Sequence, residues 1–185
     1  MIKFFGLLSK KNKVDAHETA SIIVVTLNNV IEEGFVEIKD FINNNHNLET
    51  KPNLLEEDIH WFKNIIFLGN IQNLTFFFEE DEVRKLREYI LDCMYKDLSE
   101  NDQHLAIEKF LDYENYFIDL MKENNSPIHA MVIGIFEKYN INRYQGDLFK
   151  RKNKPNPIFY NELKNLLRHF IWNWEEYLEK NKLKF

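Results

Sequence analysis

The residues whose spacing best suits metal chemistry are Glu57 and His60, which form a Glu-x-x-His pattern. Positions i and i+3 of a helix point the same way, so both side chains could hold one ion, as in carboxylate bundles that bind two metals. Such a site uses a second Glu-x-x-His, and the sequence contains no second copy. Both residues also fall in the first turns of an expected helix, where acids suit the helix dipole. The pattern therefore favours an exposed helix start over a metal site, and we expect no cofactor.

The single cysteine, Cys93, is the other candidate for reactive chemistry. It shares an apolar helical face with Leu86, Ile90 and Met94, which indicates a small core residue rather than a nucleophile. One cysteine allows no internal disulfide, which fits a reducing, cytoplasmic location. The chain has five glycines and lacks a nucleophile elbow, a phosphate loop and a dinucleotide pattern, so the sequence points away from an enzyme. Catalysis by dispersed residues stays open, because folding rather than spacing assembles a catalytic triad.

A short basic loop is the third candidate site, and its members are Lys150, Arg151, Lys152 and Lys154. It could meet a phosphate or an acidic partner, although a solvated loop explains it more simply. The formal net charge of −6 argues against general affinity for nucleic acid, because phosphate binding needs clustered Lys and Arg. A helix-turn-helix does not fit either, since the connection between the last two long helices far exceeds three or four residues.

Trp172 is the residue that the apolar pattern explains least. If residues 157–181 form one helix, Trp172 points roughly 160° away from Trp174 and shares a polar face with Arg168 and His169. Tryptophan and arginine are enriched in binding hot spots, so Trp172, Arg168 and His169 are candidates for contact with a partner protein. The alternative is that another segment, residues 1–8 or 140–155, covers the indole, because tryptophan is usually largely buried.

The elements that would position these side chains are helices. From residue 20 to residue 42, apolar side chains recur at steps of three and four, which places them on one stripe of a long helix. The same rhythm returns along the chain, and no strand-like alternation of useful length interrupts it. We therefore expect an all-α, single compact bundle-like domain of six to seven helices in which sequential neighbours pack antiparallel.

Capping residues predict where several helices begin. Asp15 precedes the first helix, Asn53 the second and Ser99 the fourth, while Ser126-Pro127 and Asn156-Pro157 each combine a cap with proline at the first helical position. The acidic residues 79–82 begin the third helix, since acids favour a first turn. Besides the second helix, the sequence predicts helices over residues 15–43, 79–98, 99–123, 127–139 and 157–181, and a short one near 145–149.

Two apolar features leave alternatives open. Gly34 interrupts the first helix without breaking its stripe, so it marks a bend or a close helix contact. The second helix opens at Pro52-Asn53 and has Leu55 in its buried stripe, but the three adjacent aromatics Phe76–Phe78 cannot all face one way on a helix. We expect that stretch to be buried on several sides or to lie at a helix junction.

Charge divides the chain unevenly. Residues 1–13 carry four lysines and no acid, and this basic amphipathic N-terminal segment precedes a single helical domain over residues 14–185. The segment is too short and interrupted for a signal peptide, and no later stretch is expected to span a bilayer. It could rest on an anionic membrane, but one short apolar patch binds weakly, so docking on the protein or fraying explains it better.

Two hypotheses about function remain. The first is a non-enzymatic protein-interaction module of a soluble bacterial type, such as an adaptor, a regulator or an immunity protein, whose partner is another protein. It rests on the missing catalytic motifs, the acidic balance and the apolar residues committed to a core. The second is a helical bundle that encloses a small apolar ligand or a metal, with or without enzymatic activity. The many large aromatics and the Glu57/His60 pair favour this alternative.

Overall fold

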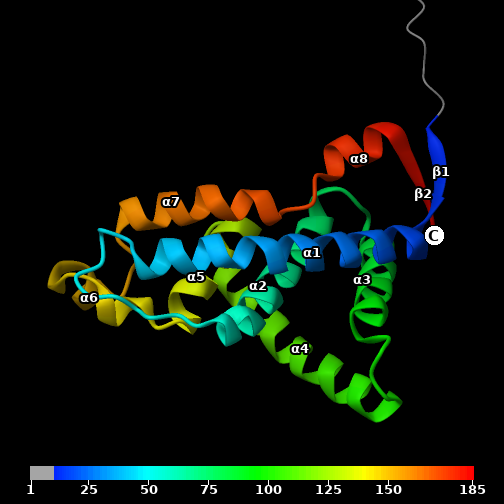
Figure 1. Ribbon diagram of the computed structural model, residues 1–185. Helices are drawn as coiled ribbons and strands as arrows, with labels where there is room; N and C mark the ends of the chain where they lie inside the picture. The colour runs from blue at the N-terminus through cyan, green and yellow to red at the C-terminus, as the bar shows by residue number, and fades with distance from the viewer. Residues whose placement is uncertain (1–10) are drawn as a thin grey trace, which may run out of the picture.

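The computed structural model describes residues 11–185, so most of the basic segment expected over residues 1–13 lies outside the described residues. The described chain is all-α apart from a small two-stranded sheet, which confirms the expected fold class (Figure 1). Its eight α-helices are α1 (Ala16–Asn43), α2 (Ile59–Asn73), α3 (Glu80–Tyr95), α4 (Glu100–Met121), α5 (Pro127–Lys138), α6 (Asp147–Lys152), α7 (Pro157–Leu167) and α8 (Trp174–Lys180). Short 3₁₀ turns are η1 (Glu56–Asp58), η2 (Leu74–Phe76), η3 (Ile141–Tyr144) and η4 (Arg168–Phe170).

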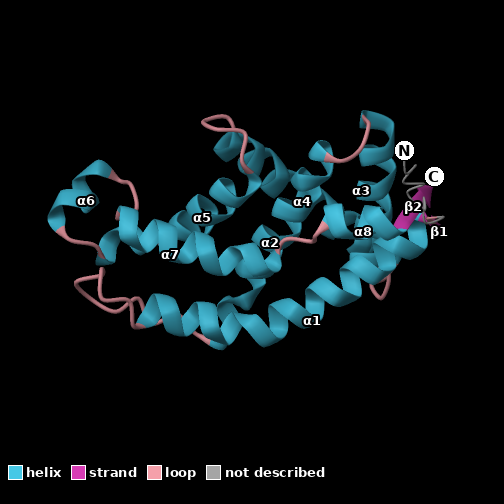
Figure 2. Ribbon diagram, turned by 90° about the horizontal axis from the view of Figure 1, so that it is seen from above, coloured by secondary structure: helices cyan, strands magenta, loops and turns pink. Residues whose placement is uncertain are grey.

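α1 is the longest helix, and it carries the predicted core stripe along one side of the molecule (Figure 2). Asp15 caps it as predicted, because its Oδ1 accepts hydrogen bonds from the backbone N–H groups of His17 (2.9 Å) and Glu18 (3.1 Å). The helix ends at Asn43, also as predicted. Its buried apolar residues follow steps of three and four: Ala16, Ala20, Ile23, Val24, Leu27, Ile31, Phe35, Ile38 and Ile42.

By length and composition, α1 is also long and apolar enough to cross a membrane, with a mean hydropathy of 1.2 over its most apolar window. The expectation that no such stretch exists was wrong on this measure. A core helix and a membrane-spanning helix both meet the criterion. Here the buried face of α1 packs against α2 and α3.

The core forms one continuous cluster in which α5 is the most enclosed helix. The predicted cap of α5 is confirmed, because Ser126 Oγ accepts from the His129 N–H and Pro127 occupies the first turn. The helices do not pack simply as a series of antiparallel neighbours. α1 packs mainly against α3, which crosses it steeply in Figure 1, and α2 packs mainly against α5.

α2 begins later than the sequence predicts. Asn53 has a φ of 63°, in the left-handed region, whereas a helix N-cap has an extended backbone. The chain therefore continues as a loop to η1, and α2 starts at Ile59. Leu55 is 55% exposed rather than buried, so its assignment to the stripe was also wrong. The phenylalanines at 76–78 lie at the junction of η2 and α3, which confirms one of the two alternatives for that stretch.

A two-stranded parallel sheet joins the two ends of the described chain, where no strand was expected. β1 (Asn12–Asp15) pairs with β2 (Asn181–Lys184), in the register Asn12 to Asn181 through Asp15 to Lys184. Four residues are too few to show an alternating pattern, and the partners lie far apart in sequence, so local spacing could not reveal the pair. The Lys11 ammonium also donates to the Leu178 carbonyl at 2.6 Å, which ties this strand to α8.

The helix expected over residues 157–181 is two helices, and the prediction of one was wrong. α7 ends at Leu167, η4 follows, and Ile171 is extended, with φ −93° and ψ 126°. Asn173 then caps α8, since its Oδ1 accepts from the Glu176 N–H at 3.2 Å. The apolar spacing continues across the break because Leu167, Phe170 and Trp174 all face the same core. This break adds one helix to the expected count.

Candidate functional site

The segment at residues 168–173, here called the α7–α8 linker, is held by a buried side chain of α2. Asn70 Nδ2 donates to the carbonyl oxygens of Ile66 (2.9 Å) and Phe170 (2.8 Å). Its Oδ1 accepts from the backbone N–H of Trp172 at 2.8 Å. Because Asn70 is 3% exposed, its bonds take the place of water for the Phe170 carbonyl and the Trp172 N–H, which have no hydrogen-bond partner within a helix. They fix the direction in which Trp172 leaves the linker.

Gly34 of α1 supports the same segment by leaving room for it. A Cβ at this position would lie 2.6 Å from the Phe170 Cζ, well inside contact distance. Glycine costs about 1 kcal/mol relative to alanine inside a helix, so its use here follows from the close approach of the Phe170 ring. The sequence left open a bend or a close helix contact at Gly34; the close contact found is with the Phe170 ring of the η4 turn.

Trp172 itself is half-buried and lies among other aromatic rings. Its ring centroid is 5.6 Å from that of Tyr177 and 6.3 Å from that of Trp174. The indole Nε1–H is buried and has no acceptor among residues 11–185. The angle inferred for Trp172 from a continuous helix does not apply, because the residue follows an extended backbone.

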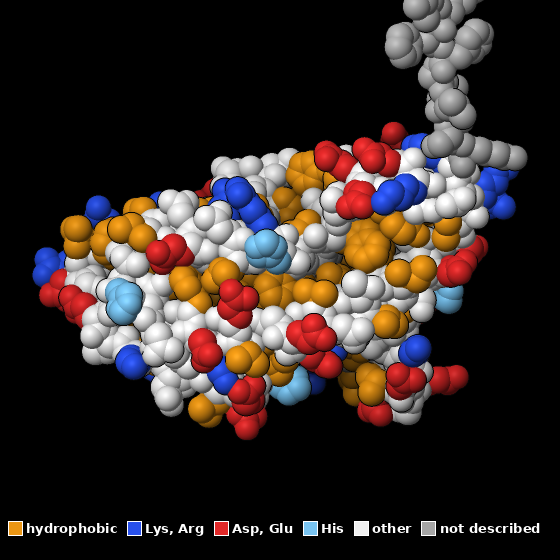
Figure 3. Space-filling view, turned by 45° about the horizontal axis from the view of Figure 1, so that its top comes forward, with side chains coloured by type: hydrophobic (Ala, Val, Ile, Leu, Met, Phe, Trp, Pro, Cys, Tyr) orange, Lys and Arg blue, Asp and Glu red, His pale blue; other side chains and the backbone are white. Residues whose placement is uncertain are grey.

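A groove of about 320 Å³ opens beside Trp172, between α1 and α8, and we call it the Trp172 groove. Figure 3 shows apolar side chains lining a hollow in this face, with acidic, basic and His side chains around it. The lining is largely apolar, and its main members are Leu27, Val30, Phe170, Ile171, Trp172 and Tyr177.

Exposed glutamates of α1 and α8 lie near the Trp172 groove, and one of them, Glu176, lines it. On α1, Glu33 and Glu37 continue the row that starts with the lining residues Thr26 and Val30, by helical spacing. On α8, Glu175, Glu176 and Glu179 are exposed. Lys180 also lines the groove, and its ammonium lies 2.9 Å from Glu176 Oε1, so these two charges offset each other.

The structure brings together the three residues predicted to contact a partner. His169 is exposed and lines the Trp172 groove. Arg168 is exposed and lines a neighbouring hollow, which Trp172 also borders together with Phe77 and Ile128. Trp172 therefore separates two depressions, and Arg168 and His169 flank it on the linker.

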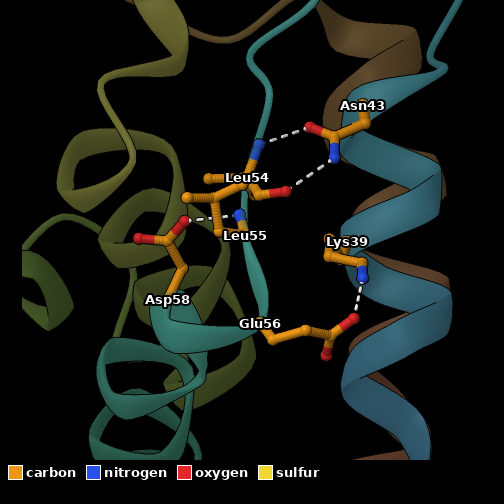
Figure 4. Close-up of polar contacts among 6 residues, drawn as sticks. All are labelled: Lys39, Asn43, Leu54, Leu55, Glu56 and Asp58. Atoms are coloured by element: carbon orange, nitrogen blue, oxygen red, sulfur yellow. Dashed lines mark hydrogen bonds and ion pairs between the residues drawn. The ribbon is translucent and has the colours of Figure 1, made fainter.

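The predicted metal pair lies apart from this groove. Glu57 belongs to η1 and His60 to α2, and both are exposed. Figure 4 shows that the neighbours of Glu57 hold the loop before α2 in place. Glu56 pairs with Lys39 of α1, and Asp58 Oδ2 accepts from the Leu55 N–H at 2.8 Å. Asn43 of α1 holds the same loop through two bonds to the Leu54 backbone. No group of three or more metal-binding side chains occurs within residues 11–185.

The basic loop is placed partly on a helix. Lys150, Arg151 and Lys152 form the last turn of α6, where cations suit the helix dipole, and all but Lys150 are fully exposed. The buried Gln145 braces the segment, because its Nε2 donates to the Lys154 carbonyl at 3.0 Å. The expected short helix near 145–149 therefore exists, shifted to Asp147–Lys152.

Cys93 is partly buried on α3 and packs against the core. Burial raises the pKa of its thiol, which lowers the fraction of reactive thiolate. This environment supports the interpretation of Cys93 as a packing residue rather than a nucleophile.

Sequence reasoning missed Asn70 and Tyr177, which position and line the groove. The signal for Asn70 was a polar residue within the apolar run 65–71, and the signal for the helix break was the Asn173-x-x-Glu176 capping pattern. No family model, curated protein or solved structure matches the chain. The Trp172 groove is the candidate site because it joins a half-exposed tryptophan, an apolar floor and nearby charged side chains.

Proposed function

We propose that the protein is a non-enzymatic interaction module whose Trp172 groove binds a short, basic, apolar segment of a partner protein. The observation that carries this proposal is the apolar groove beside Trp172, with exposed glutamates of α1 and α8 near it. Apolar side chains of the partner would occupy the floor, and its Lys or Arg side chains would meet these glutamates.

The composition of the groove matches what protein interfaces use for affinity. Tryptophan and tyrosine dominate binding hot spots, because each presents a large rigid surface that loses little side-chain entropy. Trp172 and Tyr177 stand side by side at 5.6 Å and both line the groove. The buried Nε1–H of Trp172 lacks an acceptor within residues 11–185, so a partner that offered this donor an acceptor would satisfy it.

The groove is also preorganised. Asn70 fixes the backbone of Phe170 and Trp172. Gly34 has no side chain, so the Phe170 ring packs directly against the backbone of α1. A site that is already ordered loses less entropy on binding, which favours affinity. The nearby glutamates add electrostatic steering, which selects for basic segments and weakens as salt screens the charges.

The proposal can be tested with a fluorescein-labelled peptide of alternating leucine and lysine, and with a matched peptide that has glutamate in place of lysine. The lysine peptide should bind the full chain, and Trp172→Ala should weaken binding by about 30-fold, the effect of losing a hot-spot residue. Val36→Ala is the matched control, because Val36 is exposed on α1 but does not line the groove. Fluorescence anisotropy measures the affinities, and urea unfolding shows that each variant folds.

A charge variant separates groove binding from general adhesion of the peptide. Glu176→Lys should weaken binding of the lysine peptide, whereas Glu88→Lys on α3 should leave it unchanged. Equal binding of both peptides, or equal losses for Trp172→Ala and Val36→Ala, would contradict the proposal.

A further inference from the structure

A second cavity, of about 370 Å³, lies where the end of α4, α5, the loop at residues 153–155 and the start of α7 meet. We call it the His129 cavity. Part of the lining is apolar and includes Leu120, Ile133 and Phe136. Ionisable groups line it too, including His129, which precedes Ile133 by four residues on the same face of α5, and Tyr160 of α7. Its volume falls within the range of small-molecule binding sites.

His129 is held in one orientation by Tyr160. The Nδ1 atom of the ring lies 2.7 Å from the Tyr160 hydroxyl. Burial lowers the pKa of His129, and Lys164 lowers it further against the opposing effect of Glu123, so the neutral ring predominates at neutral pH. Burial raises the pKa of Tyr160, which keeps the phenol protonated and able to donate to Nδ1. The proton of the neutral ring then sits on Nε2, which faces Glu123 Oε2 at 4.0 Å.

The cavity carries more negative than positive charge. Asp119, Glu123 and Glu137 line it, and Lys154 is the one Lys or Arg in the lining as described. Asp119 pairs with Lys122 at 2.5 Å, and Glu137 accepts from the Tyr116 hydroxyl at 2.6 Å. The Glu123 side chain is 74% exposed, and its carboxylate lies beside the neutral imidazole rather than a Lys or Arg within residues 11–185.

We propose that the His129 cavity binds a small organic amine. The ammonium group would lie beside Glu123 and the His129–Tyr160 pair, and the apolar part would pack on Ile133 and Phe136. Aromatic faces favour cations at short range. The Lys164 ammonium lies 5.9 Å from the Tyr160 ring centroid, so a bound amine is expected closer to Glu123 than to Lys164. This site is separate from the Trp172 groove and does not depend on the proposed function.

An organic amine fits this lining better than a metal ion or an anion. Within the described chain no three His, Cys, Asp or Glu side chains converge as metal ligands. An anion would meet the carboxylates of Glu123 and Glu137, which pair with no Lys or Arg within residues 11–185, against Lys154 in the lining and Lys164 beside Tyr160. An ammonium on an apolar body uses both the carboxylates and the apolar part of the lining, which neither alternative does.

The test uses three probes of one shape: phenethylamine, the neutral phenethyl alcohol and the anionic phenylacetate. The readout is the ¹⁵N and ¹H chemical shifts of the His129 ring in the full chain, assigned with His129→Gln. We expect the amine to shift these signals with a dissociation constant on the order of 1 mM, as befits so small a ligand. The alcohol should bind more weakly and phenylacetate should bind least.

Two variants locate the binding. Glu123→Gln should weaken binding of the amine about tenfold without affecting binding of the alcohol. Glu100→Gln on α4 should change the affinity of neither probe. Ile133→Trp should fill the cavity and abolish binding of both probes. Equal affinity of amine and alcohol, preference for phenylacetate, or no shift of the His129 ring by the amine would each overturn the proposal.

Discussion

The Trp172 groove and the His129 cavity depend on different kinds of interaction. The groove is apolar, and its shape depends on backbone groups held by Asn70 and on the missing side chain of Gly34. The cavity depends on ionisable side chains, because the His129–Tyr160 bond and the Glu123 carboxylate define the polar part of its lining. The two sites should therefore respond to different perturbations: packing changes should damage the groove, and pH should affect the cavity.

Asn70→Leu is expected to give the largest difference between its effect on the Trp172 groove and its effect on the His129 cavity. The change leaves the Phe170 carbonyl and the Trp172 N–H buried without partners, and each such group costs about 1–3 kcal/mol. We expect a loss of about 3 kcal/mol in the free energy of unfolding, measured with urea. The lysine peptide should lose affinity, because the linker is no longer held.

Asn165→Leu, at an exposed position of α7, is the matched control and should change stability little. Phenethylamine should still shift the His129 ring in folded Asn70→Leu. If the stability of Asn70→Leu equals that of Asn165→Leu, the three bonds of Asn70 do not hold the linker.

A smaller effect is expected from Gly34→Ala. The new Cβ would lie 2.6 Å from the Phe170 Cζ, and overpacking costs about 1–3 kcal/mol, partly offset by about 1 kcal/mol of better helix propensity. The net result should be a loss of about 1 kcal/mol and a weaker peptide affinity. Thermal or urea unfolding and anisotropy measure the two effects.

Gly134→Ala provides the comparison within the same chain. A Cβ at Gly134 would meet its nearest neighbour, Ile65, at 3.5 Å, which is an ordinary contact. This substitution should be neutral or stabilising by up to about 1 kcal/mol. Equal destabilisation by both alanines would show that Phe170 moves aside without cost.

The smallest effect is expected from pH. Burial lowers the pKa of His129 in the folded chain below its ordinary value of 6.5, so the unfolded chain binds the proton more readily. The contribution of His129 is therefore fully present above pH 6.5 and is lost as the pH falls below it. His129→Gln should reduce the drop in the urea midpoint between about pH 7.5 and about pH 5.5.

His46→Gln is the control, because His46 is exposed and should leave the pH dependence unchanged. Binding of the lysine peptide should be the same in His129→Gln as in the natural chain. A pH profile that both variants share would place the titration elsewhere in the protein.

Local patterns predicted the helices well where a cap and a stripe agreed. Asp15, Ser99, Ser126 and Asn156 all cap the helices that follow them, because each cap bonds backbone groups within its own first turn. The prediction failed at Asn53, where the cap residue adopts a left-handed conformation imposed by the loop. The residue type determines whether a left-handed backbone is tolerated, but the path of the loop determines whether Asn53 adopts it.

The candidate site was predicted only in part. Trp172, Arg168 and His169 were selected because they share a polar face of an expected helix. Trp172 and His169 line the groove and Arg168 lines the neighbouring hollow, but all three lie on a linker rather than a helix. His129 and Tyr160 were not selected, since residues 31 positions apart meet only through packing of α5 and α7. The Glu57/His60 spacing was visible in the sequence, yet the two residues belong to different elements.

Spacing and capping along the chain were enough to establish an all-α domain with a buried stripe on α1, because helices form through contacts three and four residues apart. Tertiary structure alone decided how the linker before α8 is held, the parallel pairing of β1 with β2 and both cavities. Each of these depends on groups far apart in the chain, such as the Asn70 amide and the Phe170 carbonyl. No local pattern records such contacts, since they exist only after the helices have packed.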